Sequence, residues 1–303
     1  MVIQKNVSLK NKNTYNIGGK ADYYCEPGSI DDILEILQWA DSRRVPLLVI
    51  GNGSNLLISD KGWPGVVVNL SKNYNKCEWD NNRVTAESGL MLNKLVNQVV
   101  DLGFCGMEEL SGIPGTIGGG VIMNAGAFSM TLQDTIHTVT YYDLEEKKIY
   151  SRKKDELEFG YRSSFLKRKP SIVLTSSFSF EKKCDKEILA SKRAEIQAKR
   201  RDKQPLDYPN CGSVFKRPEK NYAGTLIETS GLKGMRIGDA EVSGKHANFI
   251  INKGNATAED VRALISLIQK TVLDKTGVML EPEVIFAGEF KTSLVGTIKT
   301  DNS

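Results

Sequence analysis

An uncharged, glycine-rich segment spans residues 110–133 and reads LSGIPGTIGGGVIMNAGAFSMTLQ. It contains six glycines and no ionisable side chain, although 26% of the whole chain is charged. Glycine costs backbone entropy, and proteins use it where the chain passes close to another group or adopts a positive φ. The segment therefore indicates either a main-chain surface for a flat or anionic ligand or a tightly turned core crossover without one.

The composition indicates a soluble globular protein that is large enough for two modest domains. The chain has 303 residues, of which 40% are hydrophobic, and its net charge is +4. This charge is far below that of dedicated nucleic-acid-binding proteins, and it is compatible with a small anionic substrate. The start of the chain lacks an apolar secretory segment, and six glycines make residues 110–133 a poor membrane-spanning helix. We therefore expect a cytoplasmic protein that binds neither nucleic acid nor a membrane. The oligomeric state stays open, with a monomer favoured.

The cysteines and histidines form no metal-binding pattern. The five cysteines are scattered without a C-x-x-C pair, and only two histidines accompany them. A zinc site is therefore not expected, and the pattern fits a reducing compartment. The cysteines are Cys25, Cys77, Cys105, Cys184 and Cys211.

Hydrophobic periodicity predicts helices and strands in an irregular order, which is typical of an α+β fold. Ser29 and Thr257 each precede an apolar helical pattern and have an aspartate three residues later, the spacing of a capping box. Gly277 is expected to end the second of these helices. Further helices are predicted at 92–99 and 225–230. Strands are predicted at 47–50, 56–58, 66–70, 136–144, 147–151, 172–180, 248–252 and 283–286.

Residues 181–204 are dense in both basic and acidic side chains and contain no aromatic residue. The favoured interpretation is a solvated helix that links two units, and the alternative is an RNA-binding surface. The interspersed acidic residues and the missing aromatic platform argue for the solvated helix.

A second glycine-containing loop, Gly51-Asn52-Gly53-Ser54-Asn55, lies between two predicted strands. It lacks the third glycine and the following helix of a dinucleotide-binding fingerprint, and the chain contains no P-loop. Consecutive backbone N–H groups in a tight turn can still bind an anion, although an ordinary β-turn favours the same residues. Two glycine-rich segments that lack lysine favour a flavin dinucleotide, whose pyrophosphate suits the first segment and whose flat ring suits the second.

Six motifs then occur in one order along the chain. They are GGKADYY at 18–24, VIGNGSNLL at 49–57, GIPGTIGGGVIMNAGAF at 112–128, GYRSS at 160–164, CGSVFKRP at 211–218 and LEPEVIF at 280–286. Together they resemble the bacterial UDP-N-acetylenolpyruvoylglucosamine reductase family over residues 14–287. The resemblance implies an FAD-dependent oxidoreductase of peptidoglycan precursor synthesis. Its substrate would be a small nucleotide sugar, UDP-N-acetylglucosamine enolpyruvate. NADPH would reduce the enolpyruvyl group of this substrate through FAD, which gives UDP-N-acetylmuramate.

The resemblance also implies a domain organisation. Residues 1–182 would form an FAD-binding domain of the vanillyl-alcohol-oxidase type, with subdomains at about 1–72 and 73–182. Residues 183–290 would form a smaller α+β substrate domain, and 291–303 a polar tail. FAD would be bound noncovalently. The implied cofactor-binding residues are Gly51, Asn52, Gly53, Ser54, Asn55, Leu56, Gly112, Pro114, Gly115, Gly118, Gly119, Asn124, Gly126 and Ala127.

The resemblance assigns three catalytic residues. Ser213 would donate a proton to C2 of the substrate, and Arg162 would hold its carboxylate and stabilise the charge that develops there. Glu283 would act with Arg162 around the same group. Taken alone, Ser213 is also typical of a turn and Arg162 of a solvated surface. Glu281 is predicted to point to the same side as Glu283 unless Pro282 interrupts the strand.

Tyr161, Lys203 and Arg217 are implied as substrate-binding residues, with Tyr161 near the flavin or the substrate. Both cations are otherwise typical of a solvated surface. Cys211 occupies a position where the family commonly has alanine, and we expect thiol reagents to inactivate the protein partially there. Residues 163–200 lack the inserted tyrosine loop of one subclass, so the sequence leaves open how the diphosphate is held.

Two other functions remain open from the sequence. One is a different flavin oxidoreductase on the same scaffold, against which the motifs around Ser213 and Glu283 argue. The other is a noncatalytic nucleotide-sugar-binding or RNA-binding protein that uses residues 181–217. The two glycine-rich loops would have no role in such a protein.

Overall fold

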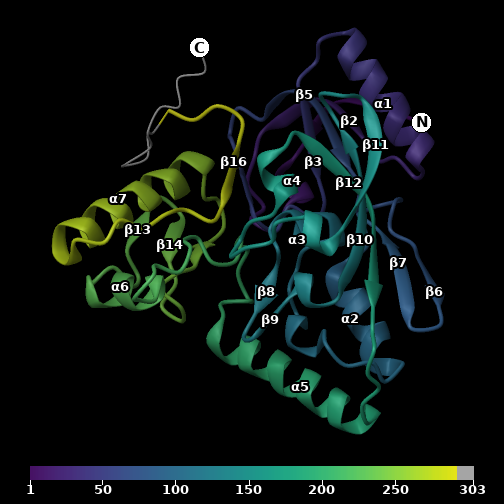
Figure 1. The fold of residues 1–303 in the computed structure, drawn as a ribbon. Helices are drawn as coiled ribbons and strands as arrows, with labels where there is room; N and C mark the ends of the chain where they lie inside the picture. Colours follow the sequence, from purple (N-terminus) through teal and green to yellow (C-terminus); the bar gives the residue numbers. More distant parts are fainter. Residues whose placement is uncertain (292–303) are drawn as a thin grey trace. The chain divides into compact units, whose positions relative to one another are not determined.

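The computed structural model describes residues 1–291, and the chain forms two compact units (Figure 1). Unit 1 comprises residues 1–5, 23–52 and 65–202, and unit 2 comprises residues 6–22, 53–64 and the chain from Lys203 onward. The domains predicted from the sequence are defined by the ligand that each would bind, whereas these units are defined by packing. The predicted domain boundaries therefore stay a prediction. Residues 292–303 of the expected tail lie outside the described residues.

Unit 1 is built around two sheets with the strand orders β1-β2-β5-β3 and β11-β10-β12-β7-β6. The first sheet pairs β3 with β5 in parallel, and the second is antiparallel throughout. Strands β1, β2 and β5 each run on into residues of unit 2. The strands are β1 (Gln4–Ser8), β2 (Lys20–Cys25), β3 (Leu47–Ile50), β5 (Trp63–Asn69), β6 (Cys77–Asp80), β7 (Arg83–Glu87), β10 (Ile136–Asp143), β11 (Lys148–Lys153) and β12 (Ser171–Ser179).

Helices cover both sheets of unit 1. Helix α1 begins as predicted, because Ser29 Oγ accepts a hydrogen bond from Asp32 N at 3.1 Å, and it buries Ile33 and Ile36 in the core of the first sheet. Helices α2 and α3 bury apolar residues in the core of the second sheet. The helices are α1 (Ile30–Ser42), α2 (Leu92–Asp101), α3 (Ile117–Ile122), α4 (Phe165–Arg168) and α5 (Lys186–Lys203), with short 3₁₀ turns η2 (Glu108–Leu110), η3 (Leu132–Asp134) and η4 (Lys154–Glu156).

The glycine-rich segment folds into short pieces rather than one continuous element. It contributes the end of η2, helix α3, the two-stranded hairpin of β8 (Gly126–Ala127) and β9 (Met130–Thr131), and the start of η3. Among the described residues, every helix is too short or too polar to cross a lipid bilayer.

Unit 2 has its own apolar core, which surrounds α7 (Ala258–Thr276). Thr257 and Asp260 form the predicted capping box of α7, and Gly277 ends the helix with φ of 72°. The other elements are η1 (Lys10–Lys12), β4 (Leu56–Ile58), α6 (Ala223–Thr229), β13 (Arg236–Ile237), β14 (Ala240–Val242), β15 (Ile250–Asn252) and β16 (Ile285–Ala287). Strands β13, β14 and β15 form one sheet, and β4 pairs in parallel with β16.

The last predicted strand begins later than the sequence indicates. The pattern predicts a strand over 283–286, but β16 starts at Ile285. Pro282 instead forms an isolated bridge with Phe215, and Glu283 N donates to Val214 O at 2.7 Å. The chain around Glu283 therefore pairs with the segment that carries Ser213 before it joins β4.

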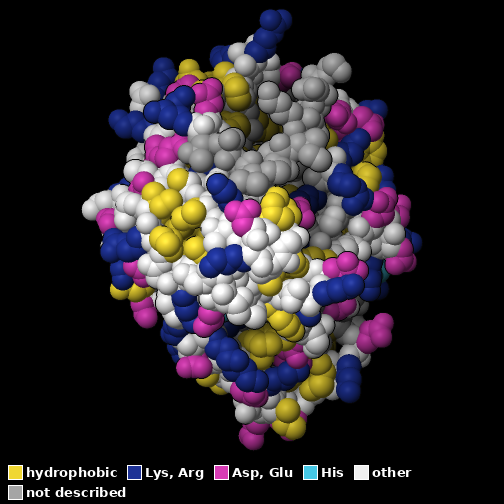
Figure 2. Space-filling model, turned by 90° about the vertical axis from the view of Figure 1, so that its left-hand side faces the viewer, with side chains coloured by type: hydrophobic (Ala, Val, Ile, Leu, Met, Phe, Trp, Pro, Cys, Tyr) yellow, Lys and Arg dark blue, Asp and Glu magenta, His cyan; other side chains and the backbone are white. Residues whose placement is uncertain are grey.

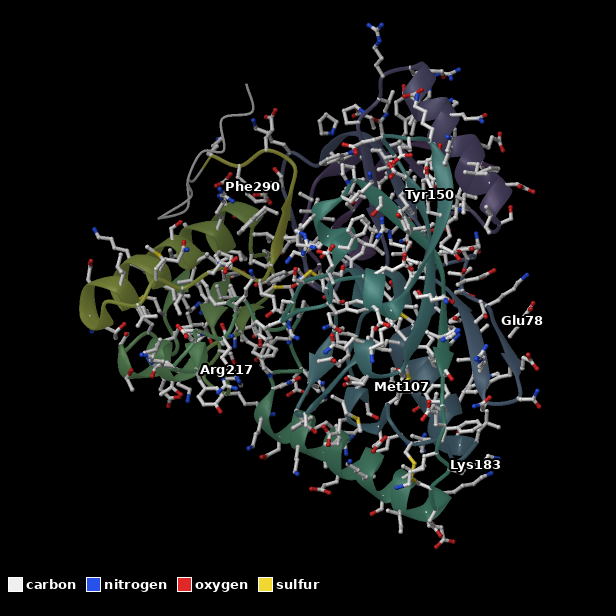
Figure 3. The ribbon with its side chains drawn as sticks, viewed as in Figure 1. Glu78, Met107, Tyr150, Lys183, Arg217 and Phe290 are labelled. Atoms are coloured by element: carbon white, nitrogen blue, oxygen red, sulfur yellow. A yellow bond between two sulfur atoms is a disulfide. The ribbon has the colours of Figure 1, made fainter. Side chains whose placement is uncertain are left out.

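One disulfide was not indicated by the cysteine pattern. Cys105 is bonded to Cys184, so Cys25, Cys77 and Cys211 are the free thiols. The two bonded cysteines lie beside an isolated β-bridge between Phe104 and Lys183. Lys183 is labelled in Figure 3.

Candidate active site

The two predicted glycine-rich segments lie against each other in unit 1. Asn52 Nδ2 donates to Pro114 O at 2.7 Å. A Cβ atom placed on Gly51 would lie only 2.2 Å from Thr116 Oγ1, so position 51 accepts no side chain. The backbone of the first loop therefore rests directly on the second segment, which the motifs alone did not show.

A cavity of about 320 Å³ opens where these segments meet. Gly51, Gly118 and Gly119 line it, as the predicted cofactor role of these glycines requires. Its walls are otherwise mainly apolar and come from β3 and from the start of β12, with Val49 and Ile172 as examples. Apolar walls of this kind suit a heterocyclic ring.

Ser88 also lines the cavity, and its hydroxyl is a polar group that a flavin nucleotide could use. Ser88 is 2% exposed, and its Oγ has no hydrogen-bond partner within the described part of the chain. An apolar pocket with one unsatisfied hydroxyl and a wall of bare glycine backbone fits a ring that carries polar edge atoms. The cavity therefore fits one end of the predicted FAD.

Other predicted cofactor residues of unit 1 support the backbone around the cavity. Gly112 N donates to Asn93 Oδ1 at 2.9 Å, and Gly115 O accepts from Leu92 N at 3.0 Å. Asn124 is buried, donates to Gly160 O at 3.0 Å and accepts from Gln133 N at 3.1 Å. Gly126 and Ala127 form β8.

Arg162 is held beside the glycine-rich segment. Its Nη2 donates to Gly126 O at 3.3 Å, and its guanidinium lies 5.1 Å from the centre of the Tyr161 ring. Tyr161 is 57% exposed. The backbone of Arg162 has φ of 51°, a left-handed conformation that is uncommon for residues other than glycine. Such a conformation persists only where surrounding contacts fix it, and it often occurs at functional sites.

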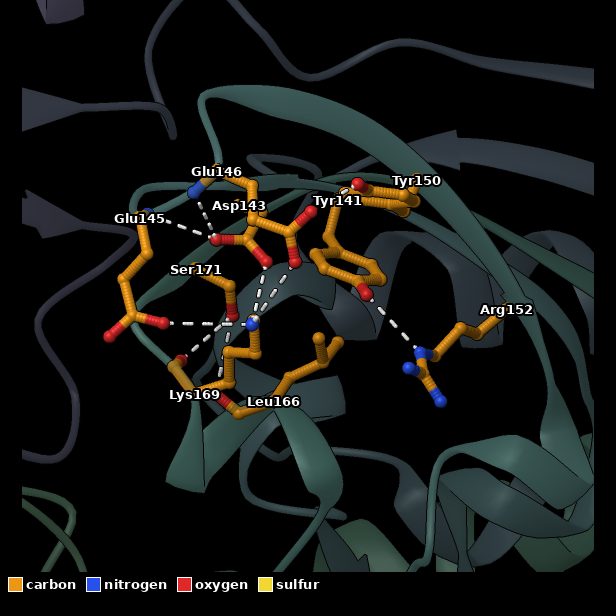
Figure 4. Close-up of polar contacts among 9 residues, drawn as sticks. All are labelled: Tyr141, Asp143, Glu145, Glu146, Tyr150, Arg152, Leu166, Lys169 and Ser171. Atoms are coloured by element: carbon orange, nitrogen blue, oxygen red, sulfur yellow. Dashed lines mark hydrogen bonds and ion pairs between the residues drawn. The ribbon is translucent and has the colours of Figure 1, made fainter.

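Lys169 is a second cavity residue that sequence reasoning missed. Its Nζ lies 2.9 Å from Asp143 Oδ2, and Glu145 and Glu146 lie further out, at 3.6 and 3.7 Å (Figure 4). Burial alone would raise the pKa of Asp143, but hydrogen bonds from the N–H groups of Glu146 and Glu145, together with Lys169, lower it overall. No motif marks Lys169 or Ser88, because only the packing of separate elements brings them to one cavity.

Arg200 on α5 also contacts the glycine-rich segment. A Cβ atom on Gly112 would lie 2.9 Å from Arg200 Cδ, and Arg200 Nε is buried without a hydrogen-bond partner among the described residues. Burial lowers the pKa of this guanidinium. The sequence placed Arg200 in a solvated helix, and charge density alone gave no sign that this side chain turns inward.

Two basic residues of α5 with acidic partners support the solvated-helix interpretation over RNA binding. Lys192 pairs with Glu108 at 3.1 Å and with Glu109 at 3.3 Å, and Arg193 pairs with Asp101 at 3.1 Å. Basic side chains are likewise interspersed with acidic ones across the face shown in Figure 2. Paired charges of this kind do not form the uninterrupted basic surface that a nucleic-acid backbone requires.

In unit 2, the segments of Ser213 and Glu283 lie side by side. The hydrogen bond from Glu283 N to Val214 O places Glu283 next to the neighbour of Ser213. Asn55 Nδ2 donates to Glu283 O at 3.0 Å, so the end of the first glycine loop meets the same segment. Arg162 belongs to unit 1, and the three predicted catalytic residues are thus divided between the units.

The other loop residues of unit 2 have structural contacts. Gly53 has φ of 64°, and a Cβ there would lie 2.6 Å from Asn13 Cβ. Leu56 pairs with Ile285. Ser54, which follows Gly53 in the chain, is half-buried.

The two glutamates of the E-P-E motif have different surroundings. Glu281 is exposed and forms an ion pair with Lys216, whereas Glu283 is half-buried and its charge acts on the Cys211 thiol. The role assigned to Glu283 stays a prediction. Arg217 is exposed, and its guanidinium lies 4.2 Å from the centre of the Tyr222 ring (Figure 3). Lys203 is exposed at the end of α5.

The burial of Cys211 argues against the predicted partial inactivation by thiol reagents at this residue. The residue is 3% exposed within the core of unit 2, and burial raises the pKa of its thiol to about 12. Thiol reagents need the thiolate, so Cys211 is a poor target. The described residues contain no group of three or more His, Cys, Asp and Glu side chains that could hold a metal ion.

Comparisons with known proteins cover nearly the whole chain. Residues 21–147 match the model of an FAD-binding domain, and residues 204–287 match that of the UDP-N-acetylenolpyruvoylglucosamine reductase C-terminal domain. These matches confirm the predicted FAD-binding module followed by a second α+β domain.

Curated relatives of the chain carry the name UDP-N-acetylenolpyruvoylglucosamine reductase, and two of them show the extent of the similarity. The one from Caldicellulosiruptor saccharolyticus is 43% identical over 292 residues, which cover 96% of this chain and 93% of the relative. The one from Caldanaerobacter subterraneus is 44% identical, with 94% and 93% covered. The crystal structure of the Thermus caldophilus reductase superposes with a TM-score of 0.78 at 32% identity, covering 95% of this chain and 100% of that structure.

Proposed function

Because the chain belongs to the UDP-N-acetylenolpyruvoylglucosamine reductase family, we propose that it reduces UDP-N-acetylglucosamine enolpyruvate to UDP-N-acetylmuramate with NADPH as reductant. The protein is an FAD-dependent oxidoreductase of peptidoglycan precursor synthesis. The observation that most supports the proposal is the cavity of unit 1, because residues of both glycine-rich segments line it and its walls fit FAD.

The chain's part in holding the cofactor follows from this cavity. Bound FAD supplies the hydride carrier between NADPH and C3 of the enolpyruvyl group. Gly51, Gly118 and Gly119 present backbone to it, and the apolar walls exclude water from the ring. Exclusion of water strengthens the electrostatic interactions within a site.

Arg162 is proposed to bind the substrate carboxylate. A planar guanidinium can make two parallel hydrogen bonds to a carboxylate, and its charge offsets the negative charge that develops as hydride adds to C3. The hydrogen bond to Gly126 O supports this role, because a guanidinium that is already held in place loses little freedom when substrate binds.

Ser213 is proposed to give its hydroxyl proton to C2, so that the carbon–carbon double bond becomes a single bond. A serine hydroxyl is a weak acid, and it suits this step because the C2 carbanion is strongly basic. The hydrogen bond that joins Glu283 to Val214 supports a role for Glu283 around the same carbon. Tyr161, Lys203 and Arg217 are proposed to contact the rest of the nucleotide sugar.

Kinetics of the Ser213→Ala variant test this proposal. We expect the yellow wild-type protein to oxidise NADPH rapidly only when the enolpyruvyl nucleotide sugar is present. General acid catalysis contributes roughly 10²–10⁴-fold, so Ser213→Ala should lower kcat by at least 100-fold. Its flavin absorbance should stay unchanged, because Ser213 is assigned to the substrate and not to the cofactor.

Ser230→Ala serves as the matched control, because Ser230 is a buried serine of the same unit that the mechanism does not use. It should keep kcat within twofold of wild type. A Ser213→Ala variant that retains more than a tenth of wild-type kcat would reject the proton-donor role and revive a different flavin reaction on this scaffold.

A further inference from the structure

Three polar residues that no motif assigns line the cavity of unit 1, namely Ser88, Lys169 and Ser171. Most of its lining is apolar or bare glycine backbone, and Lys169 is engaged by Asp143. Ser171 Oγ donates to the backbone oxygen of Lys169 at 3.0 Å. Ser88 differs from these polar residues, because its Oγ has no partner among the described residues.

The backbone of Ser88 is held from both sides. Its N–H donates to Leu174 O on β12 at 2.9 Å, and its carbonyl accepts from Gly118 N at the start of α3 at 2.8 Å. A Cβ on Gly118 would lie 2.8 Å from Ser88 Cβ, so α3 packs directly on this residue. The hydroxyl is thus carried by a rigid position between two elements that line the cavity.

A buried hydroxyl without a partner destabilises the folded state, because folding removes its hydrogen bonds to water and forms none in their place. If the hydroxyl forms a hydrogen bond with a bound ligand, that bond offsets the cost of the lost hydration. Ser176 on β12 is also buried and unsatisfied, but it does not line the cavity. The inference therefore depends on the combination of an unsatisfied hydroxyl and a cavity.

We propose that Ser88 is an FAD-binding residue whose hydroxyl hydrogen-bonds a polar edge atom of the part of the dinucleotide that enters this cavity. A volume of about 320 Å³ lies at the lower end of the range for small-molecule pockets, so it holds one heterocycle with its neighbouring atoms rather than the whole dinucleotide. Ser88 therefore acts at one end of the cofactor.

Ser88→Ala has two opposite effects under this proposal. It removes a hydrogen bond from the complex, so the Kd for FAD rises by about three- to tenfold. It also removes an unsatisfied hydroxyl from the flavin-free protein, which becomes more resistant to urea. Quenching of flavin fluorescence measures the Kd, and the urea midpoint of the flavin-free protein measures the stability.

Ser176→Ala is the matched control, because Ser176 pairs with Ala86 in the same sheet, two residues before Ser88. It should raise the urea midpoint of the flavin-free protein and leave the Kd within twofold. Tight FAD binding by wild type and by this control shows that the cofactor assignment holds whatever Ser88 does.

A Ser88→Ala protein that folds and binds FAD within twofold of wild type overturns the proposal. Ser88→Cys, which keeps the shape but is a weak hydrogen-bond donor, provides the same comparison if the alanine variant is insoluble. It too should weaken FAD binding, and a Kd equal to that of wild type would overturn the proposal.

Discussion

At the residue scale, burial controls the chemistry of Cys211. This cysteine lies two residues before Ser213, yet its thiol belongs to the core of unit 2 beside Tyr15. Burial raises its pKa to about 12, and the nearby Glu283 charge acts in the same direction. At pH 8 the thiolate, which is the reactive form, is therefore almost absent.

We predict that iodoacetamide at pH 8 alkylates Cys77 at least tenfold faster than Cys211 in the native protein, and that activity survives the treatment. Cys77 is partly exposed, whereas reagent and solvent hardly reach Cys211. Mass spectrometry of the two peptides over time measures the rates. In denaturant both cysteines should react at similar rates. Equal rates in the native protein would contradict the burial of Cys211.

At the element scale, one ion pair joins two elements near the cavity. Asp143 ends β10, is 1% exposed, and accepts hydrogen bonds from Glu145 N at 2.9 Å and Glu146 N at 3.0 Å. Its other oxygen pairs with Lys169, which precedes β12 and lines the cavity. The β10–β11 turn is therefore tied to the strand that forms one cavity wall.

We predict that Asp143→Asn lowers the urea midpoint at pH 7 and that this difference from wild type shrinks as the pH falls below about 4. The pKa of Asp143 is lowered in the folded protein. Its stabilising contribution is thus fully present above the pKa of the unfolded chain, about 3.9, and is lost as pH falls through the lower native pKa. Urea titrations at several pH values measure the effect.

Asp41→Asn is the control for this series. Asp41 pairs with Lys147 of the same β10–β11 turn at 2.7 Å, but both side chains are exposed. Exposed pairs contribute little to stability, so this variant should follow the wild-type curve at every pH. The interpretation of Asp143 fails if the difference between Asp143→Asn and wild type persists unchanged down to pH 3.

At the scale of the whole molecule, folding itself creates the cofactor cavity. Its lining runs from Leu47 to Val173 and comes from β3, the start of α3 and the start of β12. The unfolded chain has no such surface, so a ligand of the cavity binds only the folded state. Binding must then shift the folding equilibrium.

We predict that FAD at 100 times its Kd raises the melting temperature of the flavin-free protein by roughly 5–10 °C. At this ratio, binding to the folded state alone adds about 2.7 kcal/mol of stability. A change of 1 kcal/mol shifts Tm by about 2–4 °C in a domain of this size. Tryptophan fluorescence follows the transition. ATP at the same concentration should shift it far less, and a melting temperature that is indifferent to FAD would contradict the cavity assignment.

The sequence by itself determined the ends of two helices and three of the residues that line the cavity. The caps at Ser29 and Thr257 and the stop at Gly277 depend on neighbours within about four residues, so a short window of sequence contains the whole signal. The six motifs placed Gly51, Gly118 and Gly119 at the cofactor, and these three line the cavity.

Only the tertiary structure decided how these local pieces meet. The bond from Asn52 to Pro114, the disulfide between Cys105 and Cys184, and the inward turn of Arg200 each join residues far apart in the chain. Ser88 and Lys169 have no local signature either, because residues from separate elements meet at the cavity only in the folded chain. A cavity depends on packing between β3, α3 and β12, and a one-dimensional pattern does not record such distances.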